Sequence, residues 1–185
     1  MKPLFTIHAG EYLAGTYIEE NFKNCRVWIP SKDTGIDLLV TNRRNTSAVS
    51  LQVKFSKDFT HSHMADFYKD KLVVSTWFKF DRSKIESSQA DLWLFAFRPF
   101  AEYAPRFMLI QPRDLLRRIQ KIHGTRDKYD LYFTITKQDR CFETRGLKEM
   151  ERREIIQTSK RQGPRDFTVH LDNWAPVEKL NKGET

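Results

Sequence analysis

The sequence has few cysteines and no long hydrophobic run, and these absences exclude several classes of protein. Cys25 and Cys141 are the only cysteines among 185 residues, and they form no C-x-x-C pair. This usage argues against a disulfide framework or a structural zinc site and is typical of a reducing cytosol. No apolar stretch approaches the roughly 18 residues that span a bilayer, and the apolar run before Glu11 is too short for a signal peptide. We therefore expect a soluble, cytoplasmic protein with no membrane partner.

Glycine and proline are also scarce, at seven residues each, and no repeat, low-complexity tract or flexible linker interrupts the chain. Hydrophobic residues make up 39% and charged residues 30%, which is ordinary for a globular protein and excludes a disordered one. The length fits one domain that can bury a sizeable core. We predict a single domain over residues 1–185, with its core at about 8–123 and a C-terminal extension at about 124–185.

Acidic residues are too few to balance the basic ones. The 32 Lys and Arg against 24 Asp and Glu give a formal net charge of +8. This excess favours a polyanionic partner, although net charge bears on association rather than on fold. Many basic proteins bind nothing specific, so charge alone leaves the partner open.

The first segment, residues 9–24, has the pattern of an amphipathic helix. Ala14, Ile18 and Phe22 recur at helical spacing, and Glu11 falls on the same apolar face. An acid near the start of a core-facing stripe is unusual. It is either a solvated first-turn glutamate that the helix dipole favours, or a functional carboxylate.

Three strands are expected next, at residues 26–29, 36–41 and 48–55. The turn-rich segment 42–47 has the composition of a hairpin loop, which would make the last two strands antiparallel neighbours. Residues 91–97 form a continuous apolar run, as in a strand that is buried on both faces.

The remainder of the chain alternates between strand and helix patterns. Pro112 opens a predicted helix that ends at about His123, before Gly124. The pattern of residues 61–79 is ambiguous and is compatible with a short helix followed by a strand at 73–80. The other predicted elements are strands at 107–110 and 129–136, a short helix or ordered turn at 82–89, a helix at 146–157 and an irregular tail from Asn173. This order predicts an α/β domain in which helices flank a central mixed sheet.

Polar residues interrupt two of these strands where valine or isoleucine would be usual. Asp37 lies within the strand expected at 36–41. Gln52 and Lys54 follow fifteen and seventeen positions later, in the strand expected at 48–55. Residues two apart on a strand share a face, so Gln52 and Lys54 point the same way, opposite to Leu51 and its alternate neighbours. If the strands pair, a carboxylate, an amide oxygen and an ammonium meet at one edge of the sheet. Such a set can hold a hard cation and position a water beside a phosphodiester.

Together with Glu11, these residues resemble the signature of the PD-(D/E)XK nuclease superfamily. Its members share a core helix with a Glu, a strand with an Asp, and a following strand with (D/E/Q)-x-K. Glu11, Asp37, Gln52 and Lys54 occur in that order, and the resemblance covers about residues 8–97. It implies a restriction-endonuclease-like core. More loosely, residues 77–95 resemble the connection and buried strand of small bacterial members, which include Holliday-junction-resolvase-like proteins.

The resemblance implies a role for each residue. Asp37, the Gln52 side-chain oxygen and the Val53 carbonyl would bind Mg²⁺, with Mn²⁺ as a substitute, and Glu11 would hold a water or a second ion from the helix side. Lys54 would orient or activate the attacking water. Gln52 departs from the commoner acid, because it offers an oxygen without a charge and would weaken the affinity for the metal. The competing interpretation is that Asp37 ends a strand and Lys54 lies on a solvated face.

The function that follows is a metal-dependent endodeoxyribonuclease with DNA as partner. Enzymes of this type often form a homodimer to cut both strands, and the sequence leaves the oligomeric state open. The alternative is a catalytically inactive nuclease-fold module that binds nucleic acid or a protein. A basic RNA-binding domain is a weaker third hypothesis, because the sequence has no RNP-like aromatic motif and no KH-type glycine loop.

The predicted helix at 112–123 carries a basic face. Arg113, Arg117 and Lys121 recur at every fourth residue, with Arg118 nearby. Such side chains neutralise phosphates without reading sequence, which makes this face the candidate for DNA binding. An ordinary solvated helix face is the alternative.

A few further residues that could carry a function are expected to have structural roles instead. Asp33 is expected to form a turn, and the His61-x-His63 pair is expected to lie in a loop, because no third metal ligand follows at a suitable spacing. Trp174 is expected to be a packing residue rather than a base-stacking platform.

Overall fold

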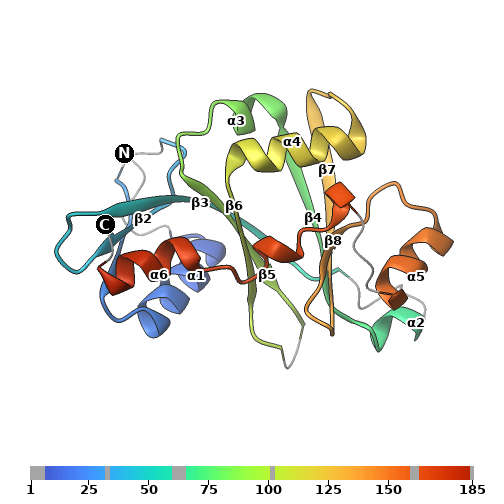
Figure 1. Ribbon diagram of the computed structural model, residues 1–185, viewed down its shortest axis with the longest axis horizontal. Coiled ribbons are helices and arrows are strands. Elements are labelled where there is room, and N and C mark those ends of the chain that lie inside the picture. Colours follow the sequence, from blue (N-terminus) through green and yellow to red (C-terminus); the bar gives the residue numbers. More distant parts are fainter. Residues whose placement is uncertain (1–6, 32–33, 60–65, 101–102, 159–162, 184–185) are drawn as a thin grey trace.

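The computed structural model describes residues 7–31, 34–59, 66–100, 103–158 and 163–183 (Figure 1). Asp33, His61 and His63 lie outside these ranges, so the interpretations of those three residues stay predictions. The described chain is an α/β structure, as the order of sequence patterns predicts.

In the described part of the chain, one mixed sheet contains five strands in the order β1-β2-β3-β5-β6. The strands β3 and β5 run parallel, and every other neighbouring pair in this sheet is antiparallel. The expected hairpin is confirmed, with Val40 of β2 opposite Val49 of β3. The bounds are β1 (Cys25–Trp28), β2 (Leu38–Asn42), β3 (Ala48–Lys57), β5 (Leu92–Arg98) and β6 (Arg106–Ile110).

A second sheet corrects the expectation of one central sheet. Within the described ranges it consists of β4 (Leu72–Asp81), β7 (Lys128–Thr136) and β8 (Cys141–Glu143), in the order β4-β7-β8 with antiparallel pairing. The strand patterns at 73–80 and 129–136 were recognisable, but alternation does not say which strands become neighbours. The strands β7 and β8 lie in the predicted C-terminal extension, and β7 pairs with β4 along the whole length of β4.

Helices lie against both sheets (Figure 1). None of those within the described residues has the length and apolarity that a membrane crossing requires. Their bounds are α1 (Ala9–Asn21), α2 (Asp66–Lys69), α3 (Arg82–Glu86), α4 (Pro112–His123), α5 (Glu149–Thr158) and α6 (Ala175–Lys182), with 3₁₀ turns η1 (Gly163–Arg165) and η2 (Thr168–His170).

The helix α6 shows that the prediction of an irregular tail is wrong. Val177 and Leu180 on this helix are buried, and Gly183 ends it in the left-handed conformation. Its eight residues are too few to give a periodic pattern that stands out. Trp174, just before the helix, is buried and stacks on Tyr17 at 4.8 Å between ring centroids, which confirms its packing role.

The residues of β5 divide between two hydrophobic cores. Trp93, Phe95 and Phe97 face the second sheet and α4, whereas Leu92, Leu94 and Ala96 belong to the core beneath α1 and α6. The strand is therefore buried on both faces, as its continuous apolar run predicts.

Helix α1 approaches β3 closely at Gly10. A Cβ added to this residue would stand 2.6 Å from the Cβ of Phe55 and 3.1 Å from the Cγ1 of Val53. These separations are shorter than the optimal contact between carbon atoms, so a side chain at this position would push the helix off the sheet.

Two glycines of α1 should therefore respond in opposite ways to alanine. Gly10→Ala should lower the free energy of unfolding by about 1–3 kcal/mol through overpacking. Gly15→Ala should raise it by about 0.5–1 kcal/mol, because its Cβ would meet only Val27 at an ordinary 3.7 Å and alanine favours the helix. Urea unfolding of both variants measures the difference, and stabilisation by both would contradict the close contact.

Candidate functional site

Asp37 lies at the end of β2 and continues its pairing with β3. Its amide donates to the carbonyl of Leu51 at 2.8 Å, although Leu51 is already the partner of Leu38. This bond extends the contact between the two chain segments one residue beyond the first residue of β2. The Asp37 carboxylate accepts a hydrogen bond from the Val53 amide at 2.7 Å. Asp37 thus lies immediately before β2, and its carboxylate lies against the Q-x-K segment.

Gln52 and Lys54 share a face of β3 that points toward the second sheet. They pair with Trp93 and Phe95 of the parallel neighbour β5, whose side chains lie in the core between the sheets. The ammonium of Lys54 lies 5.0 Å from the centroid of the Trp93 ring, within range of a cation–π interaction. Lys54 is half-buried rather than fully solvated.

The turn before Asp37 runs beside Gln52. Gly35 has a φ of 79°, a conformation that glycine adopts without strain. Its Cβ position lies 3.9 Å from the amide nitrogen of Gln52. The backbone that leads into Asp37 is therefore close to the Gln52 side chain.

Glu11 approaches from the opposite face of the sheet. Helix α1 covers the face of β3 that carries Leu51, Val53 and Phe55, and Gly10 is in direct contact with it. The Glu11 side chain is only 6% exposed, and its carboxylate accepts a hydrogen bond from the amide of His8 at 3.2 Å. Glu11 therefore stabilises the start of its own helix, but from a buried position rather than a solvated one.

The three segments meet at Val53. Its amide binds the carboxylate of Asp37, its side chain faces Gly10 next to Glu11, and Gln52 and Lys54 are its chain neighbours. The amide and carbonyl of one strand residue point to the same neighbouring strand, so the Val53 carbonyl also points toward Asp37.

These groups supply the types of oxygen atom that a hard cation takes from a protein. An aspartate carboxylate, a glutamine amide and a main-chain carbonyl are all oxygen ligands, which Mg²⁺ prefers, and Mg²⁺ usually takes only one or two carboxylates from a protein. Among the described residues, no group of three or more His, Cys, Asp or Glu side chains gathers to form a cage. A bound ion would therefore keep several waters.

The basic residues of α4 do not form one uniform surface. Arg113, Arg117 and Lys121 are exposed, whereas Arg118 is half-buried and donates to the carbonyl of Asp166 at 3.0 Å. Arg118 thus joins the helix to the C-terminal segment. A groove of about 270 Å³ lies between α4 and η1, lined by Arg117, Arg118, Lys121, Gly163 and Pro164.

Asp114 supplies a negative charge beside this groove. Burial alone would raise the pKa of its carboxyl, but the hydrogen bond from Arg117 and the charges of Arg118 and His170 together hold that pKa below its usual value. Asp114 therefore stays ionised at neutral pH and offsets part of the positive charge on this face.

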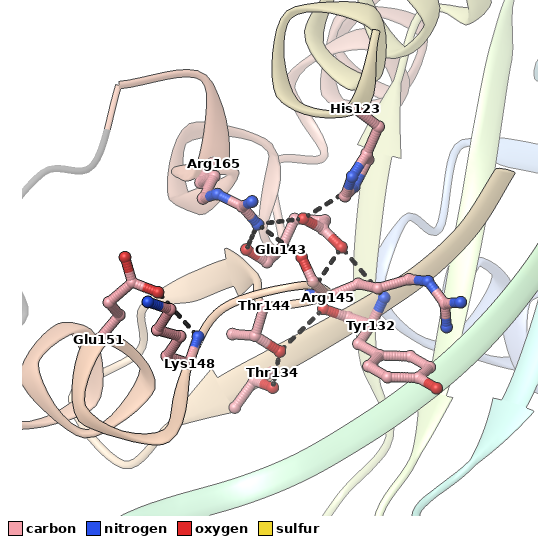
Figure 2. A network of polar contacts seen from close by, with 9 residues as sticks. All are labelled: His123, Tyr132, Thr134, Glu143, Thr144, Arg145, Lys148, Glu151 and Arg165. Carbon is pink, nitrogen blue, oxygen red and sulfur yellow. Dashed lines mark hydrogen bonds and ion pairs between the residues drawn. The ribbon is translucent and has the colours of Figure 1, made fainter. Parts of the chain in front are cut away.

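A second polar centre, which the sequence analysis missed, is built around Glu143 (Figure 2). Its fully buried carboxylate accepts from Arg165 at 2.6 Å and lies 3.1 Å from the Nε2 of His123. The amides of Arg145 and Tyr132 donate to its other oxygen, at 3.0 and 3.3 Å. No local sequence pattern signals this centre, because its residues come from α4, β7, β8 and η1. With no exposed surface, the Glu143 carboxylate is suited to joining these elements rather than to contacting a substrate.

Comparisons with protein-family models, with curated proteins and with solved structures find no match for this chain. What the chain does must therefore be inferred from its own residues.

Proposed function

We propose that this chain is a metal-dependent endodeoxyribonuclease with a restriction-endonuclease-like core of PD-(D/E)XK type. The observation that carries the proposal is the meeting of three segments at Val53. The strand with Asp37, the strand with Gln52 and Lys54, and the helix with Glu11 all contact this one residue or adjoin it. The same three elements in the same order define the family that the sequence resembles.

In this proposal Asp37, the Gln52 oxygen and the Val53 carbonyl hold Mg²⁺, or Mn²⁺ in its place, and Glu11 acts from the helix side. The ion would lower the pKa of a water and offset charge on the phosphodiester. Lys54, held against Trp93, would orient the water and donate hydrogen bonds to the phosphate oxygens as negative charge develops on them. Because Gln52 is neutral, Asp37 carries most of the electrostatic attraction for the cation.

DNA is the proposed substrate, and the exposed basic residues of α4 are its proposed contacts. Arg113, Arg117 and Lys121 lie on one exposed helix face, and Arg117 and Lys121 also line the groove against η1. Exposed basic side chains beside a groove suit a phosphate backbone, which they would bind without sequence preference.

Charge reversal on this face should weaken DNA binding and reduce its dependence on salt. Arg117→Glu with Lys121→Glu removes two cations, so the slope of log K against log salt should become shallower by about two units. Lys179→Glu with Lys182→Glu is the matched control, because both residues are exposed on α6 and the change in net charge is equal. Anisotropy titrations over a range of salt measure the slope. An unchanged slope in the α4 variant would remove this helix from the DNA interface.

A catalytically inactive nuclease-fold module is the second candidate function. It is favoured by the local partners of the two carboxylates: Asp37 accepts from the Val53 amide, and Glu11 accepts from the His8 amide. Both acids could therefore be explained by structure alone.

The deciding experiment is incubation of the purified chain with supercoiled plasmid and with a branched oligonucleotide, in Mg²⁺, in Mn²⁺ and in EDTA. Cleavage that requires the divalent ion supports the nuclease and ranks the two substrates. Salt-sensitive binding of both DNAs, with no cleavage in either metal, would favour the inactive module.

A further inference from the structure

An open cleft begins where β3 ends, beyond the candidate site. It has a volume of about 590 Å³ and is lined by Ser56, Lys57, Asp58, Phe59, Trp77 and Tyr132. This volume lies within the range of ordinary ligand pockets, about 300–1,000 Å³. No residue of the proposed metal site lines the cleft.

The cleft forms because the chain passes from one sheet to the other at this point. After β3, the carboxylate of Asp58 accepts from the amide of Ser75, and the amide of Phe59 donates to the Ser75 carbonyl, both at 3.1 Å. Ser75 lies in β4, so this connection joins the first sheet to the second. Phe59 is thereby held against the outer face of the second sheet.

That outer face carries aromatic rings that the protein does not bury. Trp77 of β4 is 53% exposed and stands opposite Tyr132 of β7, and Phe59 is 45% exposed with its ring centroid 5.8 Å from that of Tyr132. The inner face of the same strands packs Phe78 and Phe133 into the core, so the exposure of the outer rings is specific to this face.

Polar partners hold these rings in position, and Arg145 covers one face of the half-buried Tyr132 ring. The indole nitrogen of Trp77 donates to Asp130 at 3.3 Å, and the guanidinium of Arg145 lies 5.1 Å from the centroid of the Tyr132 ring. Arg145 also forms an ion pair with Asp130 at 3.6 Å. The rings therefore form a preorganised surface.

The rim of the cleft is basic. Lys57 is exposed in the lining, and Lys79 is exposed two residues beyond Trp77 on the same face of β4. The nearby acids are engaged by the protein: Asp58 is buried and accepts from Ser75, and Asp130 binds Trp77 and Arg145. Flat apolar rings between cations complement a ligand that combines planar groups with phosphates.

We propose that this cleft binds an unpaired segment of single-stranded DNA, whose bases stack on the exposed rings of Trp77 and Phe59 while Lys57 and Lys79 contact its phosphates. Aromatic platforms in basic grooves bind single strands in this way, and bases in a duplex do not expose their faces. Ser56 in the lining shares a face of β3 with Lys54, about 7 Å away along the strand. The strand would thus lead from the cleft to the proposed catalytic site, which indicates substrates with unpaired regions. Only this last step rests on the proposed function.

The test is a titration with an oligothymidylate in EDTA, followed by fluorescence anisotropy and by tryptophan quenching. Trp77→Ala should weaken binding at least about fivefold, because stacking on one aromatic side chain contributes roughly 1–3 kcal/mol per base. Trp77→Phe should restore most of the affinity. Trp28→Ala is the matched control, because Trp28 is 48% exposed but lies on β1, away from the cleft. Quenching should persist in this control and be lost in both Trp77 variants.

Three outcomes would overturn the proposal: wild-type affinity in Trp77→Ala, equal loss in Trp28→Ala, or no preference for the single strand over a duplex of the same length. Self-association that Trp77→Ala abolishes, without DNA binding, would instead assign the cleft to a second copy of the chain. Because EDTA prevents metal-dependent cleavage, binding and catalysis are measured separately and can fail separately.

Discussion

Asp37→Asn should abolish metal-dependent cleavage and leave the fold intact. The asparagine carbonyl oxygen can still accept the hydrogen bond from the Val53 amide, so the junction of β2 and β3 should persist. The negative charge is lost, and with it the main attraction for a cation beside the neutral Gln52. Metal ions stabilise the transition states of phosphodiester hydrolysis by several kcal/mol, so we expect the cleavage rate to fall by about a hundredfold or more.

Two companion variants separate the chemical role of Asp37 from its structural role. Asp37→Ala should lose cleavage and also about 1–3 kcal/mol of stability, because the Val53 amide is left without this acceptor. Lys54→Ala should lose cleavage while its DNA binding stays close to wild type. Plasmid nicking and thermal melting of all three variants provide the comparison. Cleavage by Asp37→Asn at the wild-type rate would remove Asp37 from the mechanism and leave it as a strand end.

Glu143→Ala should produce the largest loss of stability of any single change described here. Removing the carboxylate leaves Arg165 without its charged partner and the amides of Arg145 and Tyr132 without their acceptor, in a buried environment. Breaking a buried ion pair in this way costs about 3–5 kcal/mol. For a chain of this size, the melting temperature should fall by roughly 6–20 °C.

The control for this variant is Glu86→Ala, which removes an exposed glutamate that pairs with Arg82 at 3.8 Å. Exposed pairs of this kind contribute little, so its free energy of unfolding should stay within about 0.5 kcal/mol of wild type. The stability of Glu143→Gln should lie between those of Glu143→Ala and Glu86→Ala, because glutamine keeps a hydrogen-bond acceptor without the charge. A Glu143→Ala variant as stable as Glu86→Ala would show that the network around Glu143 is not needed to hold α4 to β8 and η1.

The sequence predicts the elements of the fold well where the signal is local. The helix at residues 112–123 matches α4, because Pro112 and Gly124 mark its ends and its apolar residues recur at helical spacing. The hairpin of β2 and β3 and the buried strand β5 follow from turn residues and from an unbroken apolar run. The short helix α6 and the short strand β8 give no such signal, and the sequence analysis missed both.

For the candidate site too, the sequence predicted what depends on local signals and missed what depends on the packing of the whole chain. Alternation along β3 was enough to put Gln52 and Lys54 on one face, and the hairpin was enough to bring Asp37 beside them. Helical spacing placed Glu11 on the buried face of α1. It could not reveal that this helix covers the opposite face of β3, because the side on which a helix packs depends on the whole chain.

The sequence by itself therefore determined the helices and strands with strong periodicity and the order of the four polar residues. Only the tertiary structure decided that the strands divide into two sheets, that Glu143 joins four distant segments, and that Trp77 is left exposed beside Phe59. The physical reason is that the period of a strand or helix depends on neighbours a few residues away. Pairing between β4 and β7, by contrast, brings together residues about fifty positions apart, such as Trp77 and Tyr132, and is selected by packing across the whole core.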